Sequence, residues 1–302
     1  MGALDALLDG PRAERASLLK AVFAGTWSIT AEDRSPLTVI VVARGEATYT
    51  HDAVRHQVRA GDVVLTRGPA PYTVADSPAT PPDLRILPGQ VGVDCSGAVL
   101  AESSSLGIRT WGNARPSAAT VMLIGAYQRA TSVGGLLLAQ LPPSVVLHDF
   151  DSALVEMLGA ELVDDSPGQT VVVDRLLDLV VVHAVRALLD RSASPLDPAV
   201  ARALLTMETH PERPWTVETL AAAVGLSRAA LARRFTRQVG ETPLAHLTRW
   251  RLALAADLLA ATDLPLAAIA ERVGYSNQFA LSTAFKRAHG VPPSHFRLAH
   301  AV

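Results

Sequence analysis

The sequence of 302 residues contains a single cysteine, Cys95, and only 5% aromatic residues. One cysteine cannot form an internal disulfide framework and fits a reducing compartment, so we expect a cytoplasmic protein. The first sixteen residues contain acids and lack a basic region followed by an apolar core, so we expect no secretory signal. The most apolar stretch, residues 171–189, is interrupted by four charged residues and makes a poor membrane span.

The chain also has little net charge, −2, but this small value hides an asymmetry along the sequence. Residues 210–300 contain 11 Lys and Arg against 6 Asp and Glu, whereas residues 1–209 contain 16 against 23. A length of 302 residues favours two domains. We predict an acidic domain at 1–190, a Ser/Pro-rich linker at 191–199 and a basic domain at 200–302, which would bind a polyanionic partner.

The acidic part begins with a pattern typical of strands. Apolar runs separated by Gly-containing turns occupy residues 36–50 and 56–68, and a further strand is expected at 118–128. Residues 68–83 are too rich in Pro and Gly for a helix, so we expect turns and one short strand there. Several short strands spaced by turns predict a β-barrel or a β-sandwich.

After residue 150 the hydrophobic period becomes helical, at 151–163 and again at 169–191. In the second helix, Asp174, Asp178, Arg186 and Asp190 recur at multiples of four, which leaves a wide apolar face. Two interpretations of that face stay open. The first is that the barrel covers this apolar face. The second is that the face packs against the same helix of a second subunit. The two interpretations are compatible.

The basic part contains one element twice. In the first copy we expect a helix at Val217–Val224 with Thr216 or Thr219 as its cap, a turn at Gly225, and a second helix that begins at Ser227. Gly suits the left-handed backbone just past a helix end, and Ser accepts hydrogen bonds from the free N–H groups of the next helix. Leu231 and Phe235 lie four residues apart, on the edge that we expect to be buried.

The second copy follows the same plan. Gly274 makes the turn, Ser276 or Asn277 is the cap, and Leu281 and Phe285 face inward. A helix, a glycine-containing turn and a helix form a helix-turn-helix, whose second helix fits the major groove of DNA. The helix at 243–262 between the copies spans about 25–30 Å at 1.5 Å per residue. This length is close to the ~34 Å that separates successive major-groove faces.

At this point the sequence resembles a known family. The segments LAAAVGLSRAALARRF, PLAHLTRWRLALAADLL, LPLAAIAERVGYS and AFKRAHGVPPSHFR are similar to the paired helix-turn-helix domain of AraC/XylS transcription regulators, over about residues 204–298. The resemblance is closest to the subgroup with an N-terminal cupin-like barrel. It implies an α+β chain that carries this barrel before an all-α double helix-turn-helix domain. It also implies sequence-specific DNA binding and regulation of transcription, and we expect no cofactor.

The resemblance assigns DNA contacts to residues of both second helices. In the first motif these residues are Ser227, Arg228, Ala229, Ala232, Arg233, Arg234 and Arg237. In the second motif they are Asn277, Gln278, Phe279, Ser282, Thr283, Lys286 and Arg287. We expect Arg233 to contact a base, because an Arg can bond O6 and N7 of guanine together.

The second motif departs from the family pattern. An Arg is frequent where Thr283 stands, and Phe279 replaces a small or polar residue. These two departures put base readout by the second helix in question. Methyl contacts, stacking contacts and affinity for the DNA backbone are the alternatives.

A cupin-like barrel serves either as an enzyme or as a ligand sensor. Metal-binding cupins carry a His-x-His, but this chain offers only His51 and His56, five residues apart, and Tyr72 stands where a further His would be. We therefore predict no metal site and expect both His side chains at the surface. Asp164 and Asp165 fit a helix-end loop better than a catalytic pair.

We predict instead a small-molecule effector in the barrel, with Trp27, Tyr49, Tyr72 and Trp111 as candidate lining residues, although aromatic residues on strands usually belong to the core. The other expected partners are double-stranded DNA, a second copy bound through the 169–190 helix, and RNA polymerase. Two alternatives remain, a metal-free cupin-type enzyme and an oxidation sensor at Cys95. Asp94 adjoins Cys95 and no nearby Lys or Arg would activate its thiol, which favours an ordinary cysteine.

Overall fold

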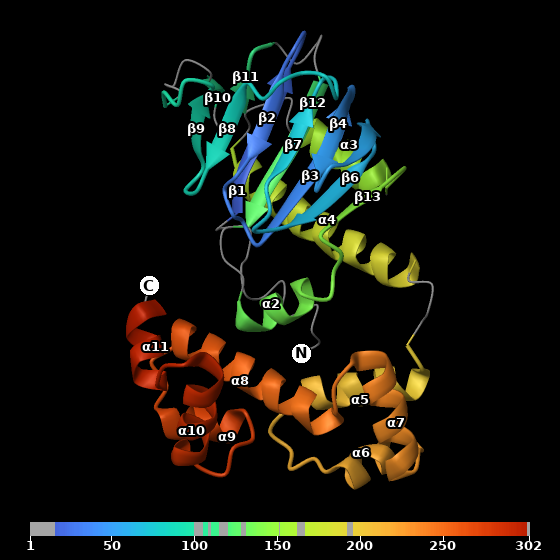
Figure 1. The fold of residues 1–302 in the computed structure, drawn as a ribbon, viewed down its shortest axis with the longest axis vertical. Helices are drawn as coiled ribbons and strands as arrows, with labels where there is room; N and C mark the ends of the chain where they lie inside the picture. Colours follow the sequence, from blue (N-terminus) through green and yellow to red (C-terminus); the bar gives the residue numbers. More distant parts are fainter. Residues whose placement is uncertain are drawn as a thin grey trace. The chain divides into compact units, whose positions relative to one another are not determined.

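The computed structural model describes the following residues: 16–99, 105–107, 110–114, 120–127, 131–150, 152–161, 167–191 and 196–300. Contacts among them divide the chain into two compact units. The strand-rich unit lies within residues 11–130 and 138–191, and the helical unit contains residues 131–137 and those after 191. Figure 1 traces both units in the order of the sequence.

The strand-rich unit contains two sheets. In the first sheet, neighbouring strands follow the order β10 (Ser105–Gly107), β11 (Thr110–Gly112), β1 (Ala16–Phe23), β12 (Thr120–Tyr127), β3 (Leu37–Arg44), β6 (Val63–Arg67) and β13 (Ser144–Leu147). In the second sheet the order is β5 (Val54–Arg59), β4 (Glu46–His51), β7 (Tyr72–Ala75), β2 (Ser28–Ala31), β8 (Leu84–Leu87) and β9 (Val91–Asp94). The expected strands at 36–50, 56–68 and 118–128 are confirmed.

The core of this unit lies between the sheets. Phe23, Ile40 and Met122 of the first sheet pack with Tyr49 and Val74 of the second, and each of these residues is buried. The sheets meet through such residues because alternate side chains of a strand point to opposite faces, and one face of each sheet is apolar.

Two helices, α3 (Ser152–Glu161) and α4 (Gln169–Arg191), follow the strands, as the change of period predicts. Strand β12 and α4 approach closely at Gly125, because a Cβ atom there would lie 2.3 Å from a methyl group of Leu177. Leu177 is fully buried, whereas Val172 and Leu179 of α4 are 40% and 45% exposed. One apolar side of α4 therefore packs within the unit, and apolar residues remain exposed elsewhere on the helix.

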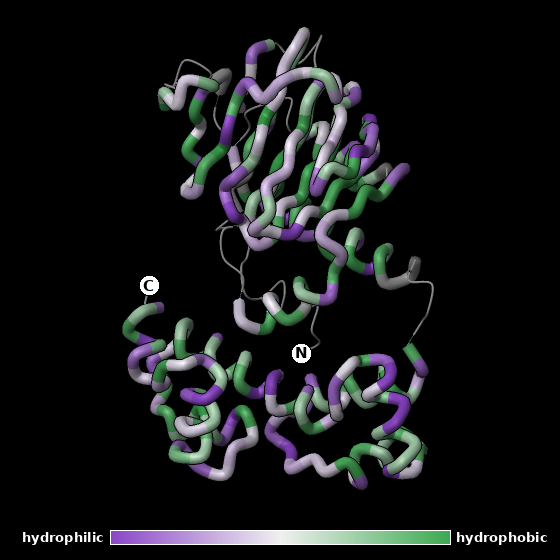
Figure 2. The backbone as a smooth tube through the Cα atoms, viewed as in Figure 1, coloured by the Kyte–Doolittle hydropathy of each residue, from purple (hydrophilic) through white to green (hydrophobic). Residues whose placement is uncertain are grey.

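The helical unit contains eight described helices. They are α2 (Ser132–Leu138), α5 (Pro198–Thr209), α6 (Val217–Ala223), α7 (Arg228–Val239), α8 (Pro243–Ala261), α9 (Leu266–Arg272), α10 (Gln278–His289) and α11 (Pro293–His300). Figure 2 shows hydrophobic and hydrophilic residues mixed along these helices, as expected for amphipathic segments around small cores. Among the described helices, none combines the length and apolar character needed to cross a membrane.

Helix α2 lies between β12 and β13 in the sequence, yet it packs on α8. The carboxylate of Asp257 accepts hydrogen bonds from the N–H groups of Ser132 at 2.6 Å and Val133 at 3.1 Å. The side chain of Val133 is buried against Trp250, which is itself 2% exposed. Burial raises the pKa of Asp257, and its hydrogen bonds oppose this shift. The sequence pattern had not predicted this helix.

Candidate nucleic-acid interface

The first helix-turn-helix consists of α6, a turn and α7. Thr216 caps α6, since its hydroxyl oxygen accepts from the N–H of Thr219 at 3.1 Å and the Thr219 hydroxyl oxygen accepts from the N–H of Thr216 at 2.9 Å. Gly225 follows with φ of +74°, a left-handed conformation that favours glycine. The Ser227 hydroxyl then accepts from the N–H of Ala230 at 3.3 Å and begins α7. The predicted caps and turn are confirmed.

The second helix-turn-helix consists of α9, a turn and α10. Gly274 takes φ of +79° in the turn. Of the two candidate caps, Asn277 begins α10, because its side-chain oxygen accepts from the N–H groups of Phe279 at 3.0 Å and Ala280 at 2.9 Å. Both α7 and α10 end at a left-handed glycine, Gly240 or Gly290.

The two motifs bury equivalent side chains. Leu231 and Phe235 of α7 are fully buried in one cluster, and Leu281 and Phe285 of α10 are fully buried in another. Helix α8 takes part in both clusters, through Leu247 in the first and through four residues in the second, Leu252, Ala255, Ala256 and Leu259. Because each motif packs on α8, one rigid helix holds both second helices.

The outer face of α7 is basic. Arg233 and Arg237 are exposed, and neither makes an ion pair with a residue that the structure describes. The exposed Arg228 lies 2.9 Å from a carboxylate oxygen of Glu218, and such a surface pair is worth little. Free guanidinium groups on an exposed helix face suit contacts with phosphates and guanine.

Arg234 differs from these arginines because it faces α5. Its Nη1 donates to the carboxylate of Asp197 at 2.8 Å, and Asp197 also accepts from the N–H of Ala199 at the start of α5. The N–H of Ala199 and then the Arg234 guanidinium hold the pKa of Asp197 below its usual value. The resemblance assigned Arg234 to DNA, but its guanidinium is paired with Asp197. This ion pair connects α7 to α5.

The outer face of α10 has a different chemistry. Gln278, Phe279 and Thr283 are exposed near its beginning, and Lys286 and Arg287 are exposed near its end. Ser282 is partly buried, as is Ala232 in α7, whereas Ala229 is exposed. All the residues predicted for the interface thus lie on α7 and α10 or at their caps, and most of them are exposed.

Two family models match the chain. A cupin model covers residues 2–190, and a helix-turn-helix domain model covers residues 220–299. An AraC-like transcription regulator of Streptomyces lividans is 33% identical over 293 residues, which cover 91% of each chain. This chain belongs to the AraC family of transcription regulators. It is a DNA-binding protein with an N-terminal cupin domain, as the sequence resemblance implied.

Further relatives of this AraC-family regulator match parts of it. The HTH-type transcriptional regulator AlkR of Acinetobacter baylyi is 36% identical over 180 residues, 55% of this chain and 59% of that protein. Among solved structures, the C-terminal domain of AraT from Geobacillus stearothermophilus covers 36% of this chain, with 38% identity and a TM-score of 0.35. The DNA-binding domain of AdpA, solved with a target DNA, covers 34%, with 32% identity and a TM-score of 0.33.

In the cupin domain of the regulator, the candidate effector residues lie mostly in the core. Trp27, Tyr49 and Tyr72 are 2%, 0% and 8% exposed, and Trp111 packs against the same cluster. Trp27 stacks on Phe23 with ring centroids 4.9 Å apart. The four side chains therefore fill the space between the sheets, and of them only Tyr72 lines a described pocket.

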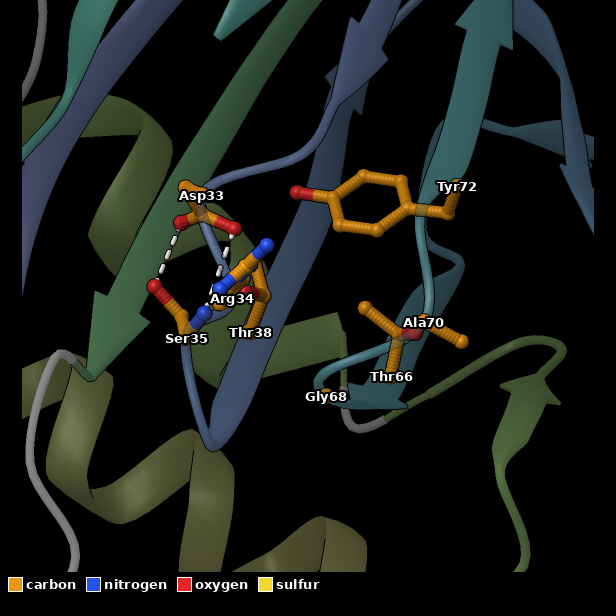
Figure 3. A pocket seen from close by; sticks show the side chains of 8 residues that line it. All are labelled: Asp33, Arg34, Ser35, Thr38, Thr66, Gly68, Ala70 and Tyr72. Carbon is orange, nitrogen blue, oxygen red and sulfur yellow. Dashed lines mark hydrogen bonds between the residues drawn. The ribbon is translucent and has the colours of Figure 1, made fainter. Parts of the chain in front are cut away.

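That pocket lies between the β2–β3 and β6–β7 connections. Figure 3 shows the Tyr72 ring on one side and Asp33, Ser35 and Thr38 on the other, with Thr66 below the ring. The Asp33 carboxylate accepts a hydrogen bond from the Ser35 hydroxyl, and the Thr66 hydroxyl is buried. Burial and, to a lesser extent, Asp33 raise the pKa of Tyr72. Apart from Tyr72, sequence reasoning missed these residues, which come from separate loops and strands.

The histidines considered for a metal site are placed differently from each other. His51 was expected at the surface, but it is 4% exposed, because it ends β4 on the inward side of the sheet. His56 is partly exposed, and its ring lies 6.5 Å from that of Tyr49. No group of three His, Cys, Asp or Glu residues suited to a metal ion occurs among the described residues. Cys95 is exposed, and Asp164 and Asp165 lie outside the described residues.

Proposed function

We propose that α7 and α10 enter successive major-groove segments of one DNA duplex, with Arg233 bonded to a guanine and Arg237, Lys286 and Arg287 at phosphates. The observation that supports this most is that α8 packs against both motifs and carries no break over its 19 residues. At about 1.5 Å per residue it spans roughly 28 Å, close to one turn of DNA at ~34 Å.

The other predicted residues of α7 and α10 take three roles in this proposal. Ser227 and Asn277 begin α7 and α10, and the positive N-terminal ends of these helices would face the duplex. Arg228, Ala229, Ala232, Gln278 and Ser282 would lie beside base edges or sugars. Arg234 would act through its ion pair with Asp197, which fixes α7 on α5, rather than by touching DNA.

We also propose that the cupin domain binds a small-molecule effector and joins two copies of the regulator. Support for the effector comes from the cupin model that matches residues 2–190. The exposed Val172 and Leu179 on α4 support pairing of two copies through this helix. Effector binding would change the arrangement of the two copies and hence the DNA half-sites that they can bind together. The regulator would act in the cytoplasm, where it would contact RNA polymerase at a promoter.

Selection of random duplex DNA on the purified full chain tests the DNA-binding mode. We expect a motif of two segments with centres one helical turn apart, and an affinity that falls steeply with salt. If α7 and α10 share one duplex, an insertion of 5 base pairs between the segments should abolish tight binding. An enriched pool without a shared motif, or tolerance of the insertion, would contradict the proposal.

A further inference from the structure

Phe279 is unusually exposed for an aromatic residue. Its side chain is 73% exposed on the first turn of α10, and no other Phe, Tyr or Trp in the described ranges is among the exposed large hydrophobic residues. The matching position in α7, counted from the buried phenylalanines, is Ala229. Truncation of this side chain would remove little packing within the chain, so the ring is available for contact with another molecule.

The neighbours of Phe279 make this part of α10 apolar. Thr283 lies four residues later on the same face, and its hydroxyl donates to the carbonyl oxygen of Phe279 at 2.9 Å. With the hydroxyl engaged, the methyl group of Thr283 is the part left for an outside contact. The side-chain oxygen of Asn277 is engaged too, because it caps the helix. The phenyl ring and the methyl group therefore lie together on the first turns of α10, next to the exposed Gln278.

The charges of α10 place this apolar face against DNA rather than against an apolar protein surface. Lys286 and Arg287 are exposed on the last turns of the same helix, and no Lys or Arg stands between Val273 and Phe285. Cations at one end attract phosphates, and the uncharged end is then directed at base edges. Helix α7 differs, since it carries Arg228 and Arg233 in its first half as well as Arg237 in its last turn.

We propose that Phe279 and Thr283 specify thymine, through contact with its C5 methyl group in the major groove. Thymine alone among the four bases presents an apolar group there. The operator segment under α10 is then defined by thymine methyl groups, whereas the segment under α7 is defined by a guanine at Arg233. This inference rests on the proposed DNA-binding mode and adds the base chemistry of its second half.

Deoxyuridine provides the test, because it keeps the hydrogen-bonding groups of thymine and lacks only the methyl group. The operator selected on the full chain is synthesised with deoxyuridine in place of each thymine of the α10 segment, one at a time. Binding is measured for the native protein, for Phe279→Ala and for Leu298→Ala. Leu298 is 79% exposed on α11, outside both motifs, and provides a matched control.

We expect deoxyuridine at one or two positions to weaken binding of the native protein about threefold to fivefold, the effect of one buried methyl group. Phe279→Ala should bind the thymine operator more weakly and should no longer distinguish thymine from deoxyuridine. Leu298→Ala should behave as the native protein. Thymines in the α7 segment provide an internal comparison. Their replacement by deoxyuridine should change the affinities of the native protein and of Phe279→Ala by the same factor.

Two results would overturn the inference while the DNA-binding mode stands. The first is that deoxyuridine at every position of the α10 segment leaves the affinity of the native protein unchanged. The second is that deoxyuridine lowers the affinity of Phe279→Ala as much as that of the native protein. A uniform loss of affinity in Phe279→Ala, with the penalty unchanged, would assign the ring to stacking or to the sugar-phosphate backbone. If no shared motif is enriched on the native protein, the proposed function fails, and this inference fails with it.

Discussion

The two helix-turn-helix motifs of this regulator share their interiors and differ in their exteriors. Leu231 and Phe235 match Leu281 and Phe285 in position and in complete burial. On the outside, Arg233 of α7 stands where α10 has Thr283. The shape of a motif is thus set by a few apolar side chains and a left-handed glycine, and its surface is free to take another chemistry. In the proposed binding mode, one chain would therefore recognise two unlike DNA segments.

The largest effect should come from a change that breaks the shared interior. Phe235→Ala and Phe285→Ala should each lower the free energy of unfolding by about 3–5 kcal/mol, because each leaves a cavity in a fully buried cluster. Phe285→Ala should cost more, since its ring contacts His289 at 4.2 Å and Phe296 at 5.3 Å between ring centroids, whereas the ring of Phe235 contacts His246 at 5.9 Å.

Urea denaturation followed by circular dichroism measures these two values, and the surface variant Leu298→Ala should stay within about 0.5 kcal/mol of the native protein. A loss below about 1 kcal/mol for either phenylalanine would contradict its role in a buried core.

Smaller effects, on DNA binding, should distinguish the outer faces of α7 and α10. Arg233→Ala should cost about 1–3 kcal/mol in binding to the selected operator and relax the preference at one base pair. Thr283→Ala, at the matching position, should cost less, because it removes one methyl contact and no bidentate hydrogen bond. Competition binding with single-base variants of the operator measures both effects.

Arg234→Ala is the matched control for this comparison, because Arg234 is bonded to Asp197. It should leave the base preference unchanged. If Arg233→Ala weakens binding to every sequence equally, Arg233 contacts a phosphate and the contrast between α7 and α10 is smaller than proposed.

The smallest effect concerns the helix caps. The side-chain oxygen of Asn277 accepts hydrogen bonds from two backbone N–H groups, with N···O distances of 3.0 and 2.9 Å. The hydroxyl of Ser227 accepts one, at 3.3 Å. Asn277→Ala should therefore lower the free energy of unfolding by about 1 kcal/mol, and Ser227→Ala by about half as much. Thermal and urea unfolding of both variants would show the order. Asn277→Asp, which keeps the acceptor, should restore stability, and a reversed order of the two alanine variants would refute the argument.

The sequence predicts the helical unit well because its signals are local. Glycine at a turn, Thr216 or Ser227 at a cap and leucine with phenylalanine four residues apart each constrain only neighbouring residues. The choice between Ser276 and Asn277 as the cap needed the structure, because both side chains can accept from a helix N-terminus. The ion pair of Arg234 could not be predicted either, since its partner Asp197 lies 37 residues away in the sequence.

The strand-rich unit is less predictable because its contacts are distant. His51 is buried although a polar residue beside Asp52 in a turn suggests exposure. Distant contacts also hid helix α2 of the helical unit. Its sequence, SVGGLLL, contains two glycines, which disfavour a helix, and its first N–H groups donate to Asp257, more than 120 residues away. The aromatic residues expected around an effector fill the core, since their strands face inward, and the pocket at Tyr72 draws on loops that have no shared pattern.

The attachment of α2 to α8 has a practical consequence for dissection of the protein. A fragment that begins after residue 195 loses the segment that covers Trp250, and the carboxylate of Asp257 loses both of its backbone donors. Such a fragment would display an indole to solvent and tend to self-associate. Weak DNA binding by that fragment would therefore report a damaged surface rather than a missing signal from the effector.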